Sequence, residues 1–467
     1  MRNFLGVFLG TGALAWILLI RRPSARKTLG ASRWMLLAWG GLGLVHWLSP
    51  IEYLAYRLST GTVLYCLLWI GFFVLGDRLG FTLRLKRRSI PMLKPPVIIR
   101  RSRWPTRAIT MVAVAGMVYL GSASIGAVTL GGESGLANLR IAQTAGMNEG
   151  LIKTVAIVLA CGGLVAFAVD LSSSILSNHR IRWWSRLGLL AYLSTYLLAA
   201  GRSGLVMGGI SLLVVAAASL QFLRKRYRRL KSMLLLAALA FLLGAGYITL
   251  VVTSRWIGTM DNKIVYMNAL GQSRLDEGFR ESLRPFGPVG DLVVEIFYYL
   301  SPQLYGLEHT LTYYRGGFGW GAVQFPYFTR RIEQVFNVNL LQRIVDADRM
   351  AFIRRGLAPN FFRTAVQTTF IDFGPVLALP FVGLCSFLAG RSRARAVRTQ
   401  SPYAIALQGL VCAGAVWTII FSPFVETGWA FPMLWLLVLG VLLKRSKSVS
   451  QPLAEERLLA QRIVSNH

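Results

Sequence analysis

The stretch LAAGRSGLVMGG at 198–209 sets an arginine between two glycines, with long apolar runs on both sides. A guanidinium stays protonated in proteins and is strongly destabilised in hydrocarbon, so Arg202 needs a compensating environment. The glycines permit a sharp turn between helices and a close approach of backbone or ligand. We therefore predict that Arg202 lies at a membrane surface and faces a polar cavity that holds an anion.

Arginine also dominates the basic residues of two polar segments, near 129–150 and 253–363, where Lys263 is almost the only lysine. A planar guanidinium binds phosphate or carboxylate through paired hydrogen bonds, which suits it better than an ammonium for such a site. This bias indicates an anionic ligand. The residues that we predict to bind it are Arg140, Arg202, Arg255 and Arg315.

Ion pairing inside the long polar segment is the competing interpretation for its arginines. The acids available there are Glu277, Glu281, Glu333, Asp346 and Asp348. Pairing is the better interpretation for Arg330, Arg331, Arg354 and Arg355. Most of the predicted anion-binding residues have few acids near them in sequence, so an external anion suits them better.

A general base beside an anion site would raise the rate of a transfer reaction by about 10² to 10⁴. Glu308 and His309 are the first candidates, and Glu133 and Glu295 are further ones. The competing interpretation of His309 is an interfacial histidine whose hydrogen bonds go to the backbone. The predicted catalytic set is Glu308, His309 and Arg202.

Asp372 falls inside a long apolar run, where an ionisable side chain is a functional hypothesis by default. We assign it to substrate binding. The competing interpretation makes Asp372 the buried partner of an arginine from the long polar segment. The sequence favours neither interpretation over the other.

Two further strings resemble nucleotide or metal sites without the surrounding pattern. GGFGWG at 316–321 lacks a strand-turn-helix context, so an aromatic turn is the better interpretation. Asp346 and Asp348 have the spacing by which many glycosyltransferases hold a metal and a sugar nucleotide, yet a solvated helix face is the better interpretation. The histidines and cysteines show no zinc spacing, and the cysteines lie in apolar runs. We expect no metal, no cofactor and no disulfide.

The elements that must position these residues are membrane helices. The chain has 467 residues, of which 54% are hydrophobic and 15% are charged, whereas soluble domains carry roughly 25% charge. Apolar runs of this length can cross a hydrocarbon core, so we predict an all-α polytopic membrane protein with about 11 transmembrane helices. The runs are 4–20, 34–50, 60–76, 108–128, 151–171, 187–201, 203–221, 232–252, 364–390, 403–421 and 428–443. The first lacks a cleavage site and is kept as an anchor.

The net charge of +32 is distributed in a pattern that fixes orientation. Basic clusters fall in alternate connections, at 21–33, 78–107, 180–186, 224–231, 391–398 and 444–447. Cytoplasmic loops concentrate Lys and Arg, so we expect the N-terminus outside and the C-terminal tail inside. Topology and contact with anionic headgroups explain this charge better than nucleic-acid binding, and we expect no nucleic acid as a partner.

This orientation gives four parts to the chain. Residues 1–252 hold transmembrane helices 1–8, and 364–444 hold helices 9–11. Residues 253–363 form an outer loop that is rich in aromatic residues and is expected to be an ordered cap. Residues 445–467 form a cytoplasmic tail. A connection as long as 253–363 is uncommon unless it is functional or disordered.

Several strings together resemble the Wzy-type polymerases of bacterial oligosaccharide repeat units, also called O-antigen polymerases. They are GGESGLANLR at 131–140, LAAGRSGLV at 198–206, Ser254-Arg255, YLSPQLYGLEHTL at 299–311 and NFFRTAVQTTFIDFGPV at 360–376. The resemblance covers about residues 108–390. It depends on the order, sidedness and spacing of these strings, together with Asp372-Phe373-Gly374 after the long outer loop. The first spans and the tail match only in hydropathy.

The resemblance implies a GT-C-like glycosyltransferase in the bacterial inner membrane, with its active site facing the periplasm. It would join oligosaccharide units carried on undecaprenyl diphosphate, without a metal, and release polyprenyl diphosphate. The implied partners are the lipid-linked donor and acceptor, the lipid bilayer and a chain-length regulator protein. Two alternatives remain open. They are an O-antigen ligase, which transfers the glycan to lipid A core, and a transporter or flippase of lipid-linked oligosaccharides.

Overall fold

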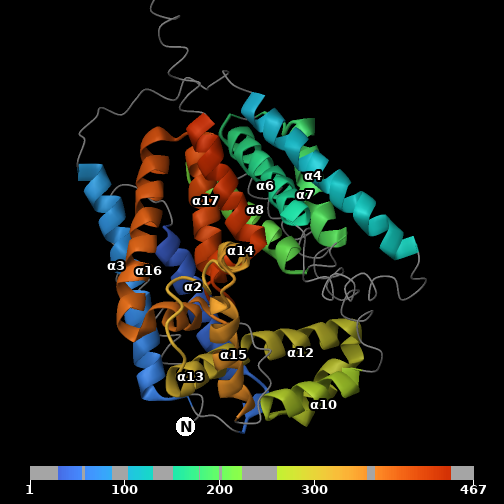
Figure 1. Cartoon of the computed structure of the whole chain (residues 1–467), viewed down its shortest axis with the longest axis vertical. Helices are drawn as coiled ribbons and strands as arrows, with labels where there is room; N and C mark the ends of the chain where they lie inside the picture. Colours follow the sequence, from blue (N-terminus) through green and yellow to red (C-terminus); the bar gives the residue numbers. More distant parts are fainter. Residues whose placement is uncertain are drawn as a thin grey trace, which may run out of the picture.

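The computed structural model shows a bundle of long helices with a smaller helical layer at one end (Figure 1). The described residues are 30–54, 58–86, 104–129, 151–177, 179–198, 202–222, 260–354 and 363–442. Within these residues the structure is helical apart from connecting segments and one two-stranded sheet. The all-α class predicted from the sequence is confirmed.

One group of helices forms the side of the bundle that includes the first described helix. It consists of α2 (Ala31–Leu48), α3 (Thr60–Lys86), α16 (Ala365–Thr399) and α17 (Pro402–Trp417). Glycines let α3 and α16 pack backbone to backbone, because a Cβ at Gly76 or Gly80 would collide with carbonyl groups of α16. Trp39 and Trp69 lie in the core between these helices, with ring centroids 6.2 Å apart.

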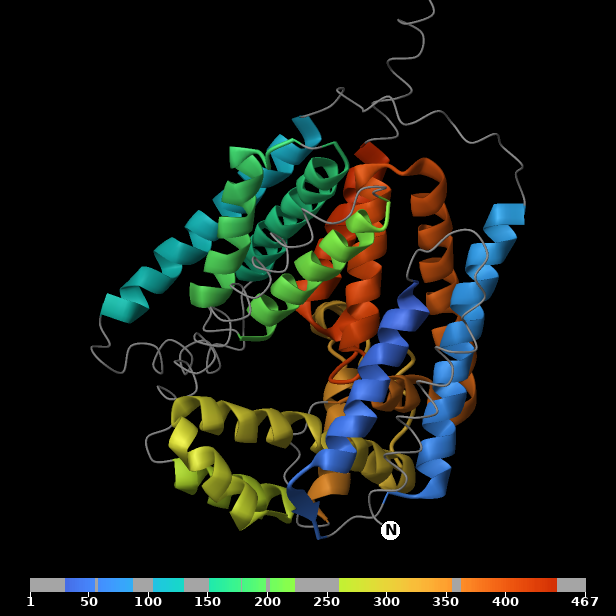
Figure 2. The same ribbon diagram turned by 180° about the vertical axis from the view of Figure 1, so that it is seen from behind.

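A second group stands beside the first, and both are visible from behind in Figure 2. It comprises α4 (Trp104–Thr129), α6 (Leu151–Ser177), α7 (Trp183–Leu198), α8 (Arg202–Leu220) and a last helix, Thr427–Leu442. Helix α17 packs against α6 and α8, so it joins the two groups. The sequence therefore builds one continuous bundle from segments on both sides of the long polar segment.

The apolar composition of the bundle identifies a membrane protein. Among the described residues, 3 helices are long and apolar enough to cross a membrane: Thr60–Arg84, Thr154–Ser177 and Ala365–Thr399. Gly204–Leu220, Pro402–Trp417 and Thr427–Leu442 are shorter apolar helices. Each predicted run between 34 and 221 and between 364 and 443 contains a helix. The predicted runs 4–20 and 232–252 lie outside the described residues.

The connections between helices alternate between the two ends of the bundle. At one end the Ser32 hydroxyl donates to Asp77 at 2.5 Å, and Arg182 lies 3.6 Å from Asp170. At the other end, β1 (Ile51–Tyr53) pairs antiparallel with β2 (Ser273–Leu275). We call this second end the outer end, because it carries the mixed-charge segment, whereas the basic clusters that are described lie at the opposite end.

The outer end is covered by the helices of residues 260–354, which we call the outer layer. They are α10 (Met260–Gly271), α11 (Glu277–Leu283), η2 (Arg284–Phe286), α12 (Pro288–Leu300), α13 (Pro302–Tyr313), α14 (Pro326–Phe336) and α15 (Leu340–Ile353). Proline at the first helical position begins α12, α13 and α14, where its fixed φ suits a helix and its missing N–H costs nothing. Ile51 and Tyr53 join Ile264 and Leu275 in a small core within this layer.

Candidate functional site

The turn that contains the GGFGWG string docks on the first turns of α16. The backbone N–H groups of Gly319 and Trp320 donate to the carbonyl oxygens of Ile371 and Asp372, at 3.2 and 2.9 Å. The aromatic turn predicted from the sequence is therefore confirmed. Its function is to join the outer layer to a membrane helix.

Asp372 is the centre of this contact. Its side chain is fully buried, and its two carboxylate oxygens accept hydrogen bonds from the backbone N–H groups of Val323, at 3.0 Å, and Gln324, at 2.7 Å. Within the described residues its partners are amides of the turn. Substrate binding by Asp372, and its pairing with an arginine of the outer segments, both stay predictions. Its carboxylate holds the turn in place.

Two glycines make the contact sterically possible. Gly374 interrupts α16 with a φ of 70°, a conformation that L side chains rarely adopt, and a Cβ there would lie 2.6 Å from the Phe318 ring. A Cβ at Gly319 would collide with the Asp372 carboxylate. The Asp372-Phe373-Gly374 string and the aromatic turn are therefore two halves of one interlocked contact.

A second buried polar group lies beside the first. The Arg363 Nε is 2.7 Å from Asp348 Oδ2, and the Thr310 hydroxyl donates to Asp348 Oδ1 at 3.4 Å. The Gln367 amide donates to Thr310 at 2.7 Å, which connects α13, α15 and α16. Burial, together with the carboxylates of Asp348 and Asp372, raises the pKa of Tyr314 to about 12.

The placement of Asp348 corrects the sequence interpretation. We predicted a solvated helix face for Asp346 and Asp348, but Asp348 is only 2% exposed, while Asp346 is half-buried and accepts from Gln342 at 2.9 Å. Side chains two positions apart do not face each other on a helix, so these acids have separate surroundings. A signal was present in the sequence, because Asp348 has helical spacing from the apolar Ile344 and Phe352.

Glu308, a predicted catalytic residue, caps a membrane helix. Its Oε2 accepts from the backbone N–H and the hydroxyl of Ser59, both at 2.8 Å, directly before α3 begins. Its Oε1 accepts from Thr312 at 3.1 Å. Glu308 is 7% exposed. Oε2 therefore holds α13 against the start of α3, while Oε1 is bonded within α13.

His309 points into the outer layer. Its side chain is fully buried, with ring centroids 4.2 Å from Phe352 and 5.0 Å from Tyr313. A general base must come within hydrogen-bond reach of the proton that it removes. The present placement of His309 keeps it away from solvent, and its predicted catalytic function stays a prediction.

Two helices flank the 199–201 segment, which lies outside the described residues. Helix α7 ends at Leu198 and α8 begins at Arg202. Gly204 and Gly208 give room to tyrosines of α7, because a Cβ at either position would collide with the ring of Tyr196 or Tyr192. The glycines therefore pack the helix pair, while the Arg202 side chain lies outside the described part of the chain.

One segment that sequence reasoning did not single out, residues 418–428, connects these sites. The Thr418 carbonyl accepts from the Ala365 N–H at 2.9 Å, and the Ser422 hydroxyl bonds to Gln324 of the aromatic turn. Thr427 shares a hydrogen bond of 3.0 Å with Tyr196. We call this segment the connector, because it brings the start of α16, the aromatic turn and the α7–α8 pair together.

The remaining predicted anion-binding residues are only partly placed. Arg140 and Arg255 lie outside the described residues. Arg315 is exposed and donates to the Tyr314 carbonyl at 3.0 Å. Arg315 directly precedes the aromatic turn, and the connector packs against the start of α8 where Gly428 lies beside Gly204.

The structure shows ion pairs at two other arginines of the outer layer, while the pairing predicted for Arg330, Arg331, Arg354 and Arg355 stays a prediction. Arg284 pairs with Glu281 at 3.3 Å and Arg274 with Glu277 at 3.9 Å, both at exposed positions where a pair contributes little. Arg355 lies outside the described residues, and Arg330 and Arg354 are exposed. The outer layer therefore presents guanidinium groups to its surroundings while its buried carboxylates hold the fold.

Within the described ranges, no group of three His, Cys, Asp or Glu side chains is arranged to hold a metal ion. Comparison with family models, with curated proteins and with solved structures finds no match to this chain.

Proposed function

We propose that this protein is a membrane glycosyltransferase that polymerises polyprenyl-diphosphate-linked oligosaccharide units at its outer end. The observation that carries the proposal is the connector. It links the strings at 198–206 and 360–376, which lie far apart in sequence. The Tyr192 hydroxyl bonds to the carbonyl oxygens of both Gly204 and Gly428, and the Ala365 N–H donates to Thr418. Gln367 joins the string at 299–311 to the same assembly through Thr310.

The start of α8 suits the diphosphate of such a donor. Helix N-termini present unsatisfied N–H groups and a partial positive charge, which favour anions. Arg202 is the first residue of α8, so a permanent cation stands at that N-terminus. Diphosphate departs as an anion, and positioned cations can stabilise the charge that develops on it.

The reaction balances without a further reagent. The acceptor hydroxyl oxygen forms a bond to the anomeric carbon of the donor sugar, and the bond from that carbon to the diphosphate oxygen breaks with its electron pair. The proton of the acceptor hydroxyl passes to a base. The products are the lengthened glycan on one lipid carrier and a free polyprenyl diphosphate.

The buried carboxylates fit this chemistry as positioning residues. Asp372 and Asp348 both accept hydrogen bonds from the chain itself, so they hold the turn and α15 against the membrane helices. A rigid layer of this kind keeps exposed guanidinium groups at fixed places above the bilayer. Misplacement of such groups by about 1 Å can lower a rate by 10²-fold.

The location and partners that the sequence implies belong to the same proposal. The outer end would face the periplasm of a bacterial cell, and the bundle would cross the inner membrane several times. Donor and acceptor would both reach the site from the bilayer, because each carries a polyprenyl chain. A chain-length regulator would be a protein partner of the same membrane.

The test is a reconstituted reaction. Purified protein in lipid nanodiscs is supplied with a short-chain polyprenyl-diphosphate oligosaccharide, and the products are separated by length. A ladder of products supports the polymerase. A single transfer that requires lipid A core indicates a ligase, and movement of the substrate across vesicles without bond formation indicates a transporter. Either of these results would overturn the proposal.

A further inference from the structure

Helix α14 carries an apolar face that the chain leaves uncovered. Phe328, Ile332, Val335 and Phe336 are between 54% and 77% exposed, and their spacing puts them on one side of the helix. The other sides of the helix carry Thr329, which is buried, and Arg330 and Gln334, which are exposed. Such a division between apolar and basic sides is typical of helices that lie in a membrane interface.

The contacts of α14 fix its depth. Arg331 donates to the Thr154 hydroxyl at 3.1 Å, and Thr154 lies three residues after the first residue of α6. Three residues of helix correspond to about 4.5 Å. Tyr327 packs against Phe431, with ring centroids 5.4 Å apart, in the first turns of the last helix. Helix α14 therefore lies at the height of the outer ends of the bundle helices.

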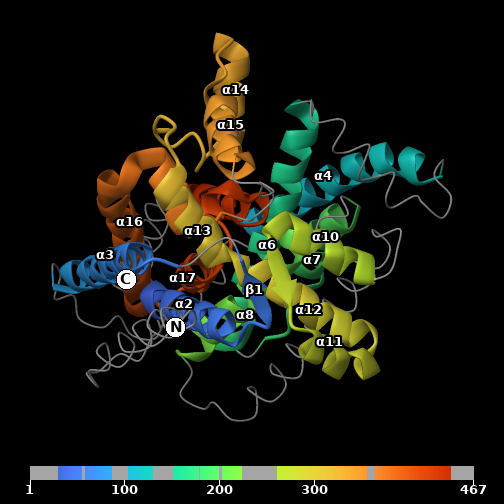
Figure 3. The same ribbon diagram turned by 90° about the horizontal axis from the view of Figure 1, so that it is seen from below.

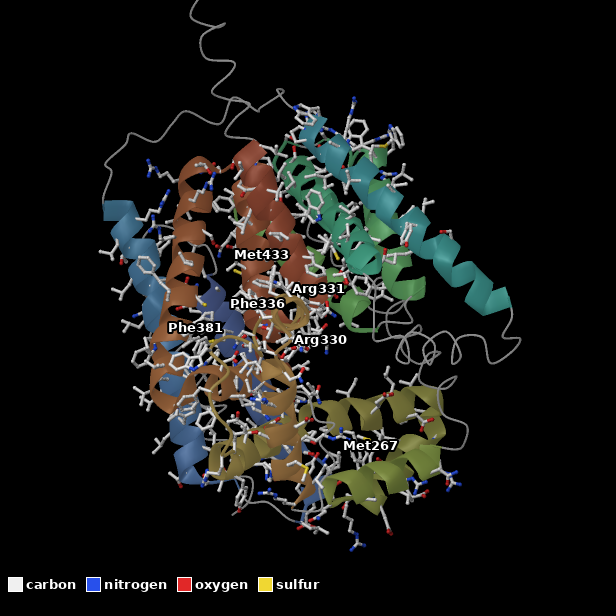
Figure 4. All side chains as sticks on the ribbon, in the orientation of Figure 1. Met267, Arg330, Arg331, Phe336, Phe381 and Met433 are labelled. Carbon is white, nitrogen blue, oxygen red and sulfur yellow. The ribbon has the colours of Figure 1, made fainter. Side chains whose placement is uncertain are left out.

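Helix α14 also lies to one side of the bundle. Seen from the outer end, α14 and α15 extend away from the rest of the molecule (Figure 3). Figure 4 marks Arg330, Arg331 and Phe336 on α14, in front of the bundle. Since bundle helices are long enough to cross a membrane, the space beside their outer ends belongs to the headgroup region of the outer leaflet.

The side chains next to α14 have the character of an interfacial belt. Trp320 and Phe318, in the aromatic turn, are 70% and 45% exposed. Trp and other aromatic residues are enriched at the headgroup level, where one part of the ring is apolar and another is wet. On α15, Arg343 and Arg349 are exposed, and they give the hairpin a basic surface.

We infer that the α14–α15 hairpin is an interfacial anchor, with the apolar face of α14 inserted into the outer leaflet and its arginines against anionic phospholipid headgroups. Two features of the hairpin indicate this lipid: the depth of its apolar face and the positive charge of its exposed arginines. The apolar face lies level with the helix ends, and the exposed guanidinium groups favour negative headgroups. This inference depends on the membrane bundle alone and does not require the proposed glycosyltransferase activity.

The experiment compares adjacent positions on different sides of α14. Val335→Cys and Gln334→Cys are prepared separately in the full-length protein, labelled with an environment-sensitive fluorophore and placed one molecule per nanodisc. Both side chains are exposed, so labelling does not require the fold to open. The chain without an added cysteine is the labelling blank, since three of its cysteines are buried and the fourth is half-buried.

We expect lipids with a nitroxide in the upper acyl chain to quench the label at 335 several-fold more than the label at 334, and aqueous iodide to do the reverse. Phosphatidylglycerol in a phosphatidylcholine disc should increase lipid quenching at 335, and Arg330→Gln should reduce that increase.

Equal iodide quenching at both positions would overturn the anchor. A label at 335 that neither quencher reaches would show that the chain itself covers this face, and this also would overturn it. Insensitivity to phosphatidylglycerol would overturn the assignment of anionic headgroups.

Discussion

The carboxylate of Asp372 accepts the backbone N–H of Gln324 at 2.7 Å, across 48 positions of sequence. The same carboxylate accepts the N–H of Val323 at 3.0 Å. A membrane helix and the outer layer are thereby joined through a buried charge and the amides of a turn. This contact explains why the aspartate and the two glycines around it occur together.

The glycine of the turn should be intolerant of a side chain. Gly319→Ala would push a methyl group against the Asp372 carboxylate, and overpacking of this kind destabilises a fold by about 1–3 kcal/mol. Gly317→Ala is the matched control, because nothing lies within 4 Å of a Cβ at that position. Thermal unfolding in detergent measures both. Equal melting temperatures for the two variants would contradict the contact.

The ion pair between Asp348 and Arg363 should contribute more to the free energy of unfolding than the nearby Asp346 does. Asp348→Ala leaves Arg363 without its carboxylate, and breaking such a pair destabilises by about 3 kcal/mol. Asp346→Ala removes an acid whose partner among the described residues is Gln342 of its own helix, so we expect a loss below about 0.5 kcal/mol.

A double-mutant cycle separates the pair from its surroundings. The double variant of Asp348→Ala with Arg363→Ala should lose less stability than the two single variants added together, because the residues are in direct contact. Additive losses would show that the two side chains act independently, and that the ion pair is not what joins α15 to the start of α16.

Glu308→Gln distinguishes a cap from a base. The structure predicts a capping effect, since the neutral amide oxygen of Gln accepts the two hydrogen bonds from Ser59 more weakly than a carboxylate oxygen does. Loss of a cap destabilises by about 1 kcal/mol. We expect a lower melting temperature and less than about a tenfold change in polymerisation rate. Unchanged stability with a rate lowered by about 10² or more would make Glu308 the general base.

Arg202→Lys tests the donor site at the start of α8. An ammonium keeps the charge but lacks the planar fork, so we expect polymerisation to fall by about 10²-fold while the protein still inserts and folds. Arg284→Lys is the control, because Arg284 forms an exposed pair in the outer layer at a position away from the connector. Polymer of normal length and yield from Arg202→Ala would remove Arg202 from the mechanism.

The sequence by itself determined the helical class and the order of the bundle. Hydropathy is a property of each segment, so the apolar runs at 60–76, 151–171 and 364–390 could be located without knowledge of their neighbours. The aromatic turn at 316–321 could be predicted for the same reason, because closely spaced glycines favour a turn in any surroundings. Local composition is enough for features that depend on local forces.

The tertiary structure alone decided which polar groups meet. Asp348 is hidden in spite of its charge because Arg363 and Thr310, on other elements, compensate it. Asp372 has backbone amides for partners, and Glu308 caps a helix almost 250 positions away, with the Ser59 N–H at a separation of 249. A charge in the sequence carries no record of its partner, since burial becomes favourable only when packing brings the two together.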